Sequence, residues 1–259
     1  MFFSLITLLT CSGYFQIEII EIEQDKGLKI DLDSVSQKWF GTTDLKHPGV
    51  ARFMKLGPFL VSGQIYHSNY EQVLETSSFL TPEQTRMIFS IKGWSRVVAF
   101  HTRNVPHAVH QWIYNFLFKK FGALLIQPLV GQYKKNEYND QLIVNANKIA
   151  AKIFKSKRVM SIPFFSYPRY AGYREAALHA IVRKNYGCTH FWVGRDHAGY
   201  KKFYNYMQSQ IFCKKNQKRL KIKIVAEREP FYCNKCKLIK NRKCQTVNLY
   251  RRNNIKIKV

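Results

Sequence analysis

The sequence predicts an α/β protein built on a parallel sheet. From residue 96 onward, short apolar segments typical of buried strands alternate with longer segments of helical periodicity. The helical segments are long enough to serve as the crossover connections that parallel strands require. The chain has 259 residues, of which 46% are hydrophobic and 15% aromatic, so it can bury a sizeable core.

The first 80 residues differ from the rest and predict a small, mostly β domain with many turns. The opening MFFSLITLLTCSG resembles the apolar core of a signal peptide, but it has no basic leading segment and is short for a membrane span. The next stretch, FQIEIIEIEQ, alternates apolar and acidic residues at period two, as a half-buried strand does. We therefore interpret residues 1–23 as strands of a folded domain, and expect no membrane association.

A larger domain is expected over residues 81–225. It opens with a helix in LTPEQTRMIFSIKGW, where Thr81 can cap the helix, Pro82 suits its first turn and Gln84 completes a capping box. The strands predicted after it are at 96–100, 123–131, 159–165, 189–194 and 220–226. The helices predicted between them are at 108–122, 139–154, 174–187 and around 205–212. Residues 226–259 form a basic segment that contains cysteines and has no clear helical period.

The formal net charge is +26 and the pI is near 9.9. Such a charge is typical of proteins that bind nucleic acid or another anion. The basic residues are nevertheless spread along the chain rather than confined to one stripe, and Lys, Asn, Ile, Phe and Tyr are abundant throughout. We therefore favour a compositional origin for the charge and do not predict a nucleic-acid partner. The six cysteines do not form a secreted disulfide pattern, which favours a cytoplasmic location.

One polar cluster, HTRNVPHAVH, follows the strand at 96–100. If a helix begins near Pro106, His107 and His110 share one face of its first turn, where free backbone N–H groups attract phosphate oxygens. Arg103 adds a forked cation that fits a tetrahedral oxyanion, while Thr102 and Asn104 add neutral donors. This pattern predicts an anion site. The alternative is that His110 packs under the helix and His107 faces solvent.

A second cluster, GRDHAG, follows the strand at 189–194. Gly194 and Gly199 allow close backbone approach, Arg195 and His197 supply donors, and Asp196 can orient one of them or meet a nucleoside. Both clusters come at carboxyl ends of predicted parallel strands, where such sheets bind ligands. The alternative is a charged turn held by an Arg195–Asp196 pair.

These motifs resemble the ATP sulfurylase (sulfate adenylyltransferase) family. The resemblance is carried by GTTDLKHPGVARF, GWSRVVAFHTRNVPHAVH, LLIQPLVG and RYAGYREAALHAIVRKNYGCTHFWVGRDHAG, and covers roughly residues 12–245. It implies a PUA-like β domain followed by a Rossmann-like nucleotidyltransferase domain of the HxGH type. It also implies transfer of adenylyl from ATP to sulfate with release of diphosphate, Mg²⁺ accompanying the ATP, and self-association into a homo-oligomer.

The resemblance assigns roles to residues of both clusters. It places sulfate against His101, Arg103 and the backbone of Ala198, and gives Thr102 and Asn104 active-site positions. It assigns His107 and His110 to the β,γ-phosphates. The loop of Gly194, Arg195, Asp196 and His197 would bind ATP together with His101, Thr102, Arg103 and Asn104.

The chain departs from the family pattern at several places. His101 stands where many members have Gln, a sulfate contact, which leaves open a different acceptor. Cys233, Cys236 and Cys244 match a structural zinc site of some members, but the expected fourth ligand falls near Asn248, a poor zinc ligand. The family pattern looks shortened at both ends. An inactive homologue that binds RNA is therefore the alternative to an active enzyme.

Overall fold

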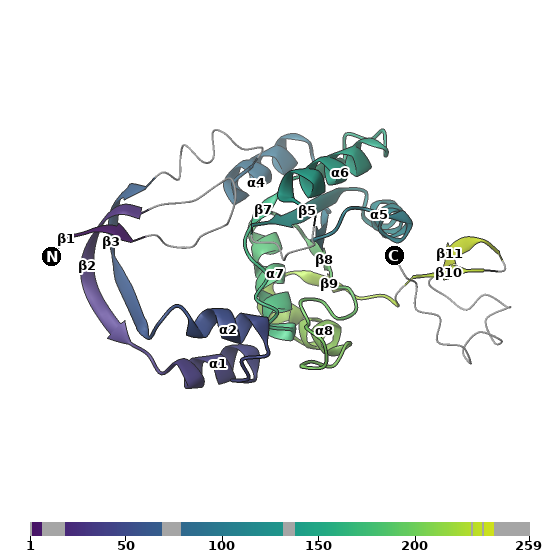
Figure 1. Ribbon diagram of the computed structural model, residues 1–259. Coiled ribbons are helices and arrows are strands. Elements are labelled where there is room, and N and C mark those ends of the chain that lie inside the picture. The colour runs from purple at the N-terminus through teal and green to yellow at the C-terminus, as the bar shows by residue number, and fades with distance from the viewer. Residues whose placement is uncertain are drawn as a thin grey trace.

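The computed structural model describes residues 2–6, 19–68, 79–131, 138–228, 230–234 and 236–240. Its helices and strands, in chain order, are β1 (Phe2–Ile6), β2 (Ile19–Lys29), α1 (Leu32–Phe40), α2 (Pro48–Met54), β3 (Phe59–Ser68), α4 (Pro82–Ile91), β4 (Val98–Thr102), α5 (Ala108–Phe121), β5 (Leu124–Val130), α6 (Asp140–Lys152), β6 (Val159–Ser161), β7 (Phe164–Phe165), α7 (Tyr173–Asn185), β8 (His190–Trp192), α8 (Gln208–Leu220), β9 (Lys223–Val225), β10 (Phe231–Cys233) and β11 (Leu238–Lys240) (Figure 1).

The central sheet is parallel, which confirms the predicted fold class. Its strands lie in the order β6-β5-β4-β8-β9, and β7 pairs with the end of β5 beyond β6. The chain runs from β4 outward through β5 and β6, then crosses back to place β8 and β9 on the other side of β4. The order therefore reverses between β4 and β8. In open α/β sheets ligands bind at this switch point, outside the carboxyl ends of the strands.

Alternate residues of each strand enter separate apolar cores, one on each face of the sheet. Ala99, Leu125 and Phe191 pack in one core with residues of α4, α7 and α8. Their neighbours Phe100 and Ile126 pack in the other core with residues of α5 and α6. Because both faces of the sheet are covered, the sequences of the central strands are continuous apolar runs rather than alternating apolar and polar residues.

The predicted capping box of α4 is present. The Thr81 hydroxyl accepts a hydrogen bond from the Gln84 backbone N–H at 3.2 Å, and the Gln84 side chain accepts one from the Thr81 backbone N–H at 2.8 Å. The last predicted helix is longer than expected, since α8 continues to Leu220. Its second half is rich in lysine and has few apolar residues, so the helical pattern of apolar residues is weak there.

The first 80 residues contain the antiparallel sheet β1-β2-β3, but also two helices that the sequence analysis did not predict. Asp31 caps α1 by accepting from the backbone N–H groups of Asp33 and Ser34, and Gly41 ends it with a φ of +74°. The side chain of His47 caps α2, where its Nδ1 accepts from the Val50 N–H at 3.2 Å. Residues 7–18 of the predicted N-terminal strands lie outside the described residues.

The helices α1 and α2 lie against the α7 and α8 side of the parallel sheet, whereas the β1-β2-β3 sheet lies apart from it (Figure 1). The contact is aromatic and hydrogen-bonded. The fully buried His47 places its Nε2 2.9 Å from the Tyr170 carbonyl oxygen, and the Tyr204 hydroxyl donates to the Phe40 carbonyl at 2.7 Å. His47 accepts at Nδ1, so its Nε2 carries the proton that it donates to Tyr170.

Near the C-terminus, β10 and β11 form a short antiparallel hairpin. No helix in the described part of the chain is both long enough and apolar enough to cross a membrane.

Candidate active site at the sheet switch point

A cavity of about 150 Å³ lies where β4 and β8 end. Its lining combines both predicted clusters with residues of the segment before α7 and of α7 itself: His101, Thr102, Arg103, Asn104, His110, Leu129, Pro168, Tyr170, Glu175, His179, His197 and Ala198. A cavity of this volume has room for a group the size of a tetrahedral oxyanion.

The two clusters meet because the loop after β8 is tied to its neighbours. The Gly172 N–H donates to the Ala198 carbonyl at 2.9 Å, and the Ser209 hydroxyl donates to the His197 carbonyl at 2.8 Å. Ala198 has a φ of +59°, so the loop turns sharply at the point where it faces β4.

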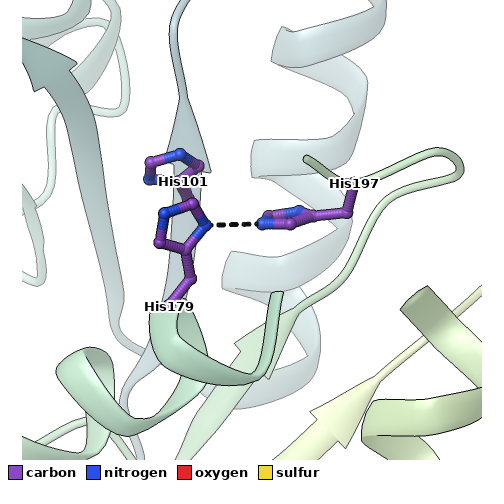
Figure 2. Close-up of side chains that lie close together, drawn as sticks. All are labelled: His101, His179 and His197. Atoms are coloured by element: carbon purple, nitrogen blue, oxygen red, sulfur yellow. Dashed lines mark hydrogen bonds between the residues drawn. The ribbon is translucent and has the colours of Figure 1, made fainter. Parts of the chain in front are cut away.

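Three histidines from separate elements gather in this cavity (Figure 2). His101 comes from β4, His179 from α7 and His197 from the loop after β8. His179 Nδ1 and His197 Nε2 lie 3.0 Å apart in a hydrogen bond, and the rings of His101 and His179 have their centroids 4.2 Å apart.

These histidines are kept neutral. Burial, together with the neighbouring Arg183 and Arg103, lowers the pKa of His197 to about 3. Burial also holds the pKa of His101 and of His179 well below the usual range, with added repulsion from nearby guanidinium groups and from each other. Neutral imidazoles can each donate one hydrogen bond and accept one.

One ring nitrogen of each histidine lies within 4.8 Å of the others, a spacing that a metal ion could bridge. The surroundings nevertheless favour an anion over a dication. His179 and His197 use nitrogens to bind each other, and the Arg183 guanidinium occupies Nδ1 of His101 at 2.6 Å. Because guanidinium groups surround the cluster, a second positive ion would be repelled.

The helix α7 supplies three site residues that the sequence analysis missed. Glu175, His179 and Arg183 are spaced four residues apart and share the buried face of the helix with two alanines. The sequence signal that could have identified these three residues is their spacing, which places polar side chains on the buried face of a helix. They point into a site rather than into solvent, since Arg183 and Glu175 are 0% and 1% exposed.

Glu175 is the one carboxylate among the lining residues. One of its oxygens accepts from the Arg169 N–H at 2.9 Å, and the other accepts from the Ala171 N–H at 3.0 Å. The first oxygen also lies 3.6 Å from His179 Nε2, an ion-pair distance longer than a hydrogen bond. Burial raises the pKa of this carboxyl, and the backbone N–H groups and guanidinium groups oppose that rise. Because both oxygens accept, we take the group as ionised.

Arg103 is held by Tyr170, another residue that the sequence analysis did not assign. An Arg103 Nη donates to the Tyr170 hydroxyl at 3.0 Å, and the guanidinium carbon lies 5.0 Å from the centre of the tyrosine ring. Arg103 is the guanidinium group among the lining residues, and Arg169 and Arg183 lie close enough to lower the pKa of His179 as well. Glu175 is the one carboxylate of the lining, against these three positive groups. This balance suits a dianion.

Thr102 and Asn104 are fixed by a buried network. The Thr102 hydroxyl accepts from the Asn104 N–H at 3.1 Å, which turns the chain at the end of β4. The fully buried Asn147 of α6 donates to the Asn104 carbonyl at 3.2 Å and accepts from the Tyr114 hydroxyl at 3.1 Å. The turn is therefore anchored to both α5 and α6.

His107 and His110 lie together, as expected, with ring centroids 4.1 Å apart. The helix α5 begins at Ala108 rather than near Pro106, so His107 is its N-cap, and its Nδ1 accepts from the Val109 N–H at 3.3 Å. His110 is 9% exposed, and its Nδ1 has no hydrogen-bond partner among the described residues. Burial and the neighbouring His107 lower the pKa of His110 to about 4.

The remaining predicted residues lie outside this cavity. Arg195 and Asp196 are exposed on the turn after β8. A Cβ at Gly199 would collide with the Asp196 side chain, whereas at Gly194 it would meet no atom closer than 3.8 Å. The space beside Gly199 is thus taken up by the Asp196 side chain, and the role predicted for both glycines stays a prediction.

A larger cavity of about 810 Å³ lies away from this chemistry, along β9 and the end of α5. Five lysines line it: Lys120, Lys214, Lys218, Lys221 and Lys223. Its only acidic lining residue, Glu227, binds Lys120 at 3.2 Å. It holds none of the predicted site residues, so size alone does not identify the site.

Two of the three predicted zinc ligands, Cys233 and Cys236, lie in the C-terminal hairpin of β10 and β11. Cys233 ends β10 and Cys236 follows in the turn, where the Lys237 N–H donates to the Cys233 carbonyl at 2.8 Å. This turn has the C-x-x-C spacing that provides two of the four ligands of a structural zinc site. Cys244 lies outside the described residues, so the zinc site stays a prediction.

The fold and the site together define an α/β protein with a pocket at its switch point, lined by Arg103 and by histidines that are neutral, and such a lining suits an anion. The sequence profile of the ATP-sulfurylase family matches residues 76–257, more than two thirds of the chain. The chain therefore belongs to the ATP-sulfurylase family.

The chain is similar to curated proteins named sulfate adenylyltransferase. It is 39% identical over 225 residues to that of Thermococcus onnurineus (strain NA1) and 41% identical over 201 residues to that of Pyrococcus abyssi (strain GE5 / Orsay). These matches cover 86% and 77% of this chain, but only 59% and 52% of the two relatives. The chain thus spans just over half the length of the curated relatives it matches. It also has a TM-score of 0.49 and 18% identity to a solved structure titled "Hexameric APS kinase from Thiobacillus denitrificans", over 71% of this chain and 34% of that one.

Proposed function

We propose that this chain transfers the adenylyl group of ATP to sulfate and releases diphosphate. The observation that carries the proposal is a small pocket at the switch point that is lined by Arg103 and three neutral imidazoles, with the guanidinium groups of Arg169 and Arg183 close to them. A dianion of tetrahedral shape suits such a pocket. The names of the relatives, sulfate adenylyltransferase, support the same reaction.

The geometry suits in-line attack without a covalent intermediate. Sulfate is a poor nucleophile that must approach an anionic triphosphate, so the protein has to neutralise charge and align the reacting groups. The pocket contains no pair of free carboxylates for acid–base chemistry, because the Glu175 oxygens are occupied by backbone N–H groups. Sulfate would attack the α-phosphorus while the bond to diphosphate breaks.

Each predicted residue takes a role in this reaction. Arg103, His101 and the backbone at Ala198 would hold sulfate, and the turn of Thr102 and Asn104 would meet the α-phosphate. His107 and His110 would bind the departing phosphates at the start of α5. The loop of Gly194, Arg195, Asp196 and His197 would hold the nucleoside, with Arg195 and Asp196 exposed outside the small cavity.

Mg²⁺ would accompany ATP and neutralise phosphate charge. The pocket offers no free carboxylate to hold this ion, so the phosphates themselves and water would be its ligands. Cys233 and Cys236 would contribute to a separate structural zinc site in the hairpin, if Cys244 and a fourth ligand complete it.

The test is sulfate-dependent release of diphosphate from ATP by the purified chain. We expect Arg103→Ala to lose activity by about a hundredfold or more, since the lost donor faces developing charge. Arg96→Ala is the matched control, because it removes an exposed arginine just before the opposite end of β4. Equal sulfate-dependent activity in wild type and Arg103→Ala would contradict the proposal.

We further propose that the catalytic domain spans 81–225 and that the β1-β2-β3 sheet represents a PUA-like domain. Self-association and a cytoplasmic location stay predictions as well. Sedimentation of the full chain would test the predicted self-association.

A further inference from the structure

Arg183 is a buried cation with no acidic partner. Its side chain is fully buried, and no carboxylate forms a salt bridge with it among the described residues. It lies 4.7 Å from the centre of the Phe164 ring and 3.5 Å from the His179 carbonyl oxygen. Burial lowers its pKa to about 9, so it remains charged at neutral pH. Burying a charge without a charged partner is costly, and the hydrogen bonds that the charge makes have to offset part of that cost.

The shortest of these hydrogen bonds reaches His101. Nη2 of Arg183 lies 2.6 Å from Nδ1 of His101. A guanidinium group can only donate, so Nδ1 of His101 must accept and carry no proton. Since His101 is neutral, its single ring proton is on Nε2. Because Nδ1 is bonded to Arg183, the polar group that His101 can offer to a ligand in the pocket is Nε2–H.

We propose that Arg183 locks His101 as a hydrogen-bond donor and thereby sets the preference of the pocket for oxyanions that carry no proton. This inference rests on the proposed function of the pocket. An unrestrained neutral histidine can exchange tautomers and accept a hydrogen bond as readily as it donates one. Sulfate has only acceptor oxygens at neutral pH, whereas inorganic phosphate carries at least one O–H that needs an acceptor. Arg183 removes His101 as that acceptor, so it is a positioning residue that acts through His101.

The tautomer can be measured without any turnover. In the wild-type full chain with ¹⁵N-labelled histidine, we expect the His101 resonances to show a protonated Nε2 and an unprotonated Nδ1. A protonated Nδ1 in the wild type overturns the proposal, and this result needs no variant that folds. It is also independent of whether the chain uses sulfate as a substrate.

The selectivity is measured with sulfate and inorganic phosphate as competing probes, in the presence of α,β-methylene-ATP, which cannot react. In Arg183→Met we expect the preference for sulfate over phosphate to fall by about tenfold or more, because His101 regains the ability to accept. Arg183→Lys keeps a buried donor cation and should restore at least part of the preference. Lys184→Met is the matched control, since it removes a charge from the next position of α7 and should leave the preference unchanged.

The outcomes separate the two proposals. Preference and His101 tautomer both unchanged in Arg183→Met would overturn the role of Arg183, even if the enzyme turns sulfate over. Absence of sulfate-dependent turnover in wild type would instead count against the proposed function, while a changed oxyanion preference in Arg183→Met would still support the inference.

Discussion

Gly172 is the residue whose replacement tests most directly how the site is held together. It precedes α7 with φ +56° and ψ −128°, a backbone conformation that residues with a side chain rarely adopt. A Cβ built at this position would lie 2.7 Å from the Tyr204 ring. Its own N–H donates to the Ala198 carbonyl of the loop after β8. Gly172→Ala therefore both strains the backbone and displaces the packed Tyr204 ring.

The cost has two parts. The disfavoured backbone conformation costs about 1–3 kcal/mol. Displacing a packed aromatic ring adds about 1–3 kcal/mol. We therefore expect Gly172→Ala to lower the free energy of unfolding by about 2–6 kcal/mol, less the small gain of about 0.4–1 kcal/mol that any Gly→Ala change brings through the unfolded state.

Gly93→Ala is the matched control. Gly93 has a φ of +64°, but a Cβ there would meet no atom within 4 Å. It should cost only the left-handed backbone term of about 1–2 kcal/mol. Urea unfolding of both variants and wild type measures the difference. If the two variants differ by less than about 1 kcal/mol, the close packing of Tyr204 against Gly172 does not carry the energy we assign to it.

Three further predictions concern the groups around the pocket. Tyr170→Phe keeps the ring beside Arg103 but removes the hydroxyl that accepts at 3.0 Å, so kcat/KM for sulfate should fall about 10- to 100-fold. Asn147→Leu leaves the Asn104 carbonyl and a buried hydroxyl without partners, and should lower the free energy of unfolding by about 2–4 kcal/mol in urea titrations. His110 stabilises the folded chain above pH 6.5, and this contribution is lost as the pH falls toward about 4, a difference of about 2.5 pKa units or about 3 kcal/mol. In His110→Gln the acid sensitivity of urea unfolding should shrink by that amount.

The first two of these predictions have matched controls. Tyr138→Phe and Asn145→Leu make the same chemical changes at exposed positions and should behave like wild type. An Asn145→Leu loss as large as that of Asn147→Leu would show that the buried network is not the cause. If His110→Gln is as acid-sensitive as wild type, the protonation of other groups dominates acid unfolding.

The parallel sheet could be predicted from the sequence because its signals are local. Each strand is a short apolar run, each crossover has helical periodicity, and the capping box of α4 is contained in four residues. The strand-end clusters could be placed at one edge because parallel strands end on the same side. The meeting of His101, Thr102, Arg103, Asn104, His197 and Ala198 in one cavity follows from that rule.

Other parts of the site depend on contacts between distant segments. Arg183 lies 82 residues from His101 in the sequence, and no local pattern connects them. Tyr170 contacts both Arg103 and His47, and these three residues come from three separate parts of the chain. The helices α1 and α2 were missed although Asp31 and Gly41 mark the ends of α1, because the turn-rich composition around them favoured a β interpretation.

The buried His47 connects the N-terminal part of the chain to the pocket. His47 fixes the Tyr170 backbone carbonyl, and the hydroxyl of the same tyrosine holds Arg103. A chain that began at residue 81 would keep every residue that lines the pocket and would still lose this support. The proposed domain boundary at residue 81 therefore divides the sequence but not the contacts that support the pocket. A protein in which residues 81–225 were joined to another domain would need α2 as well to keep this support.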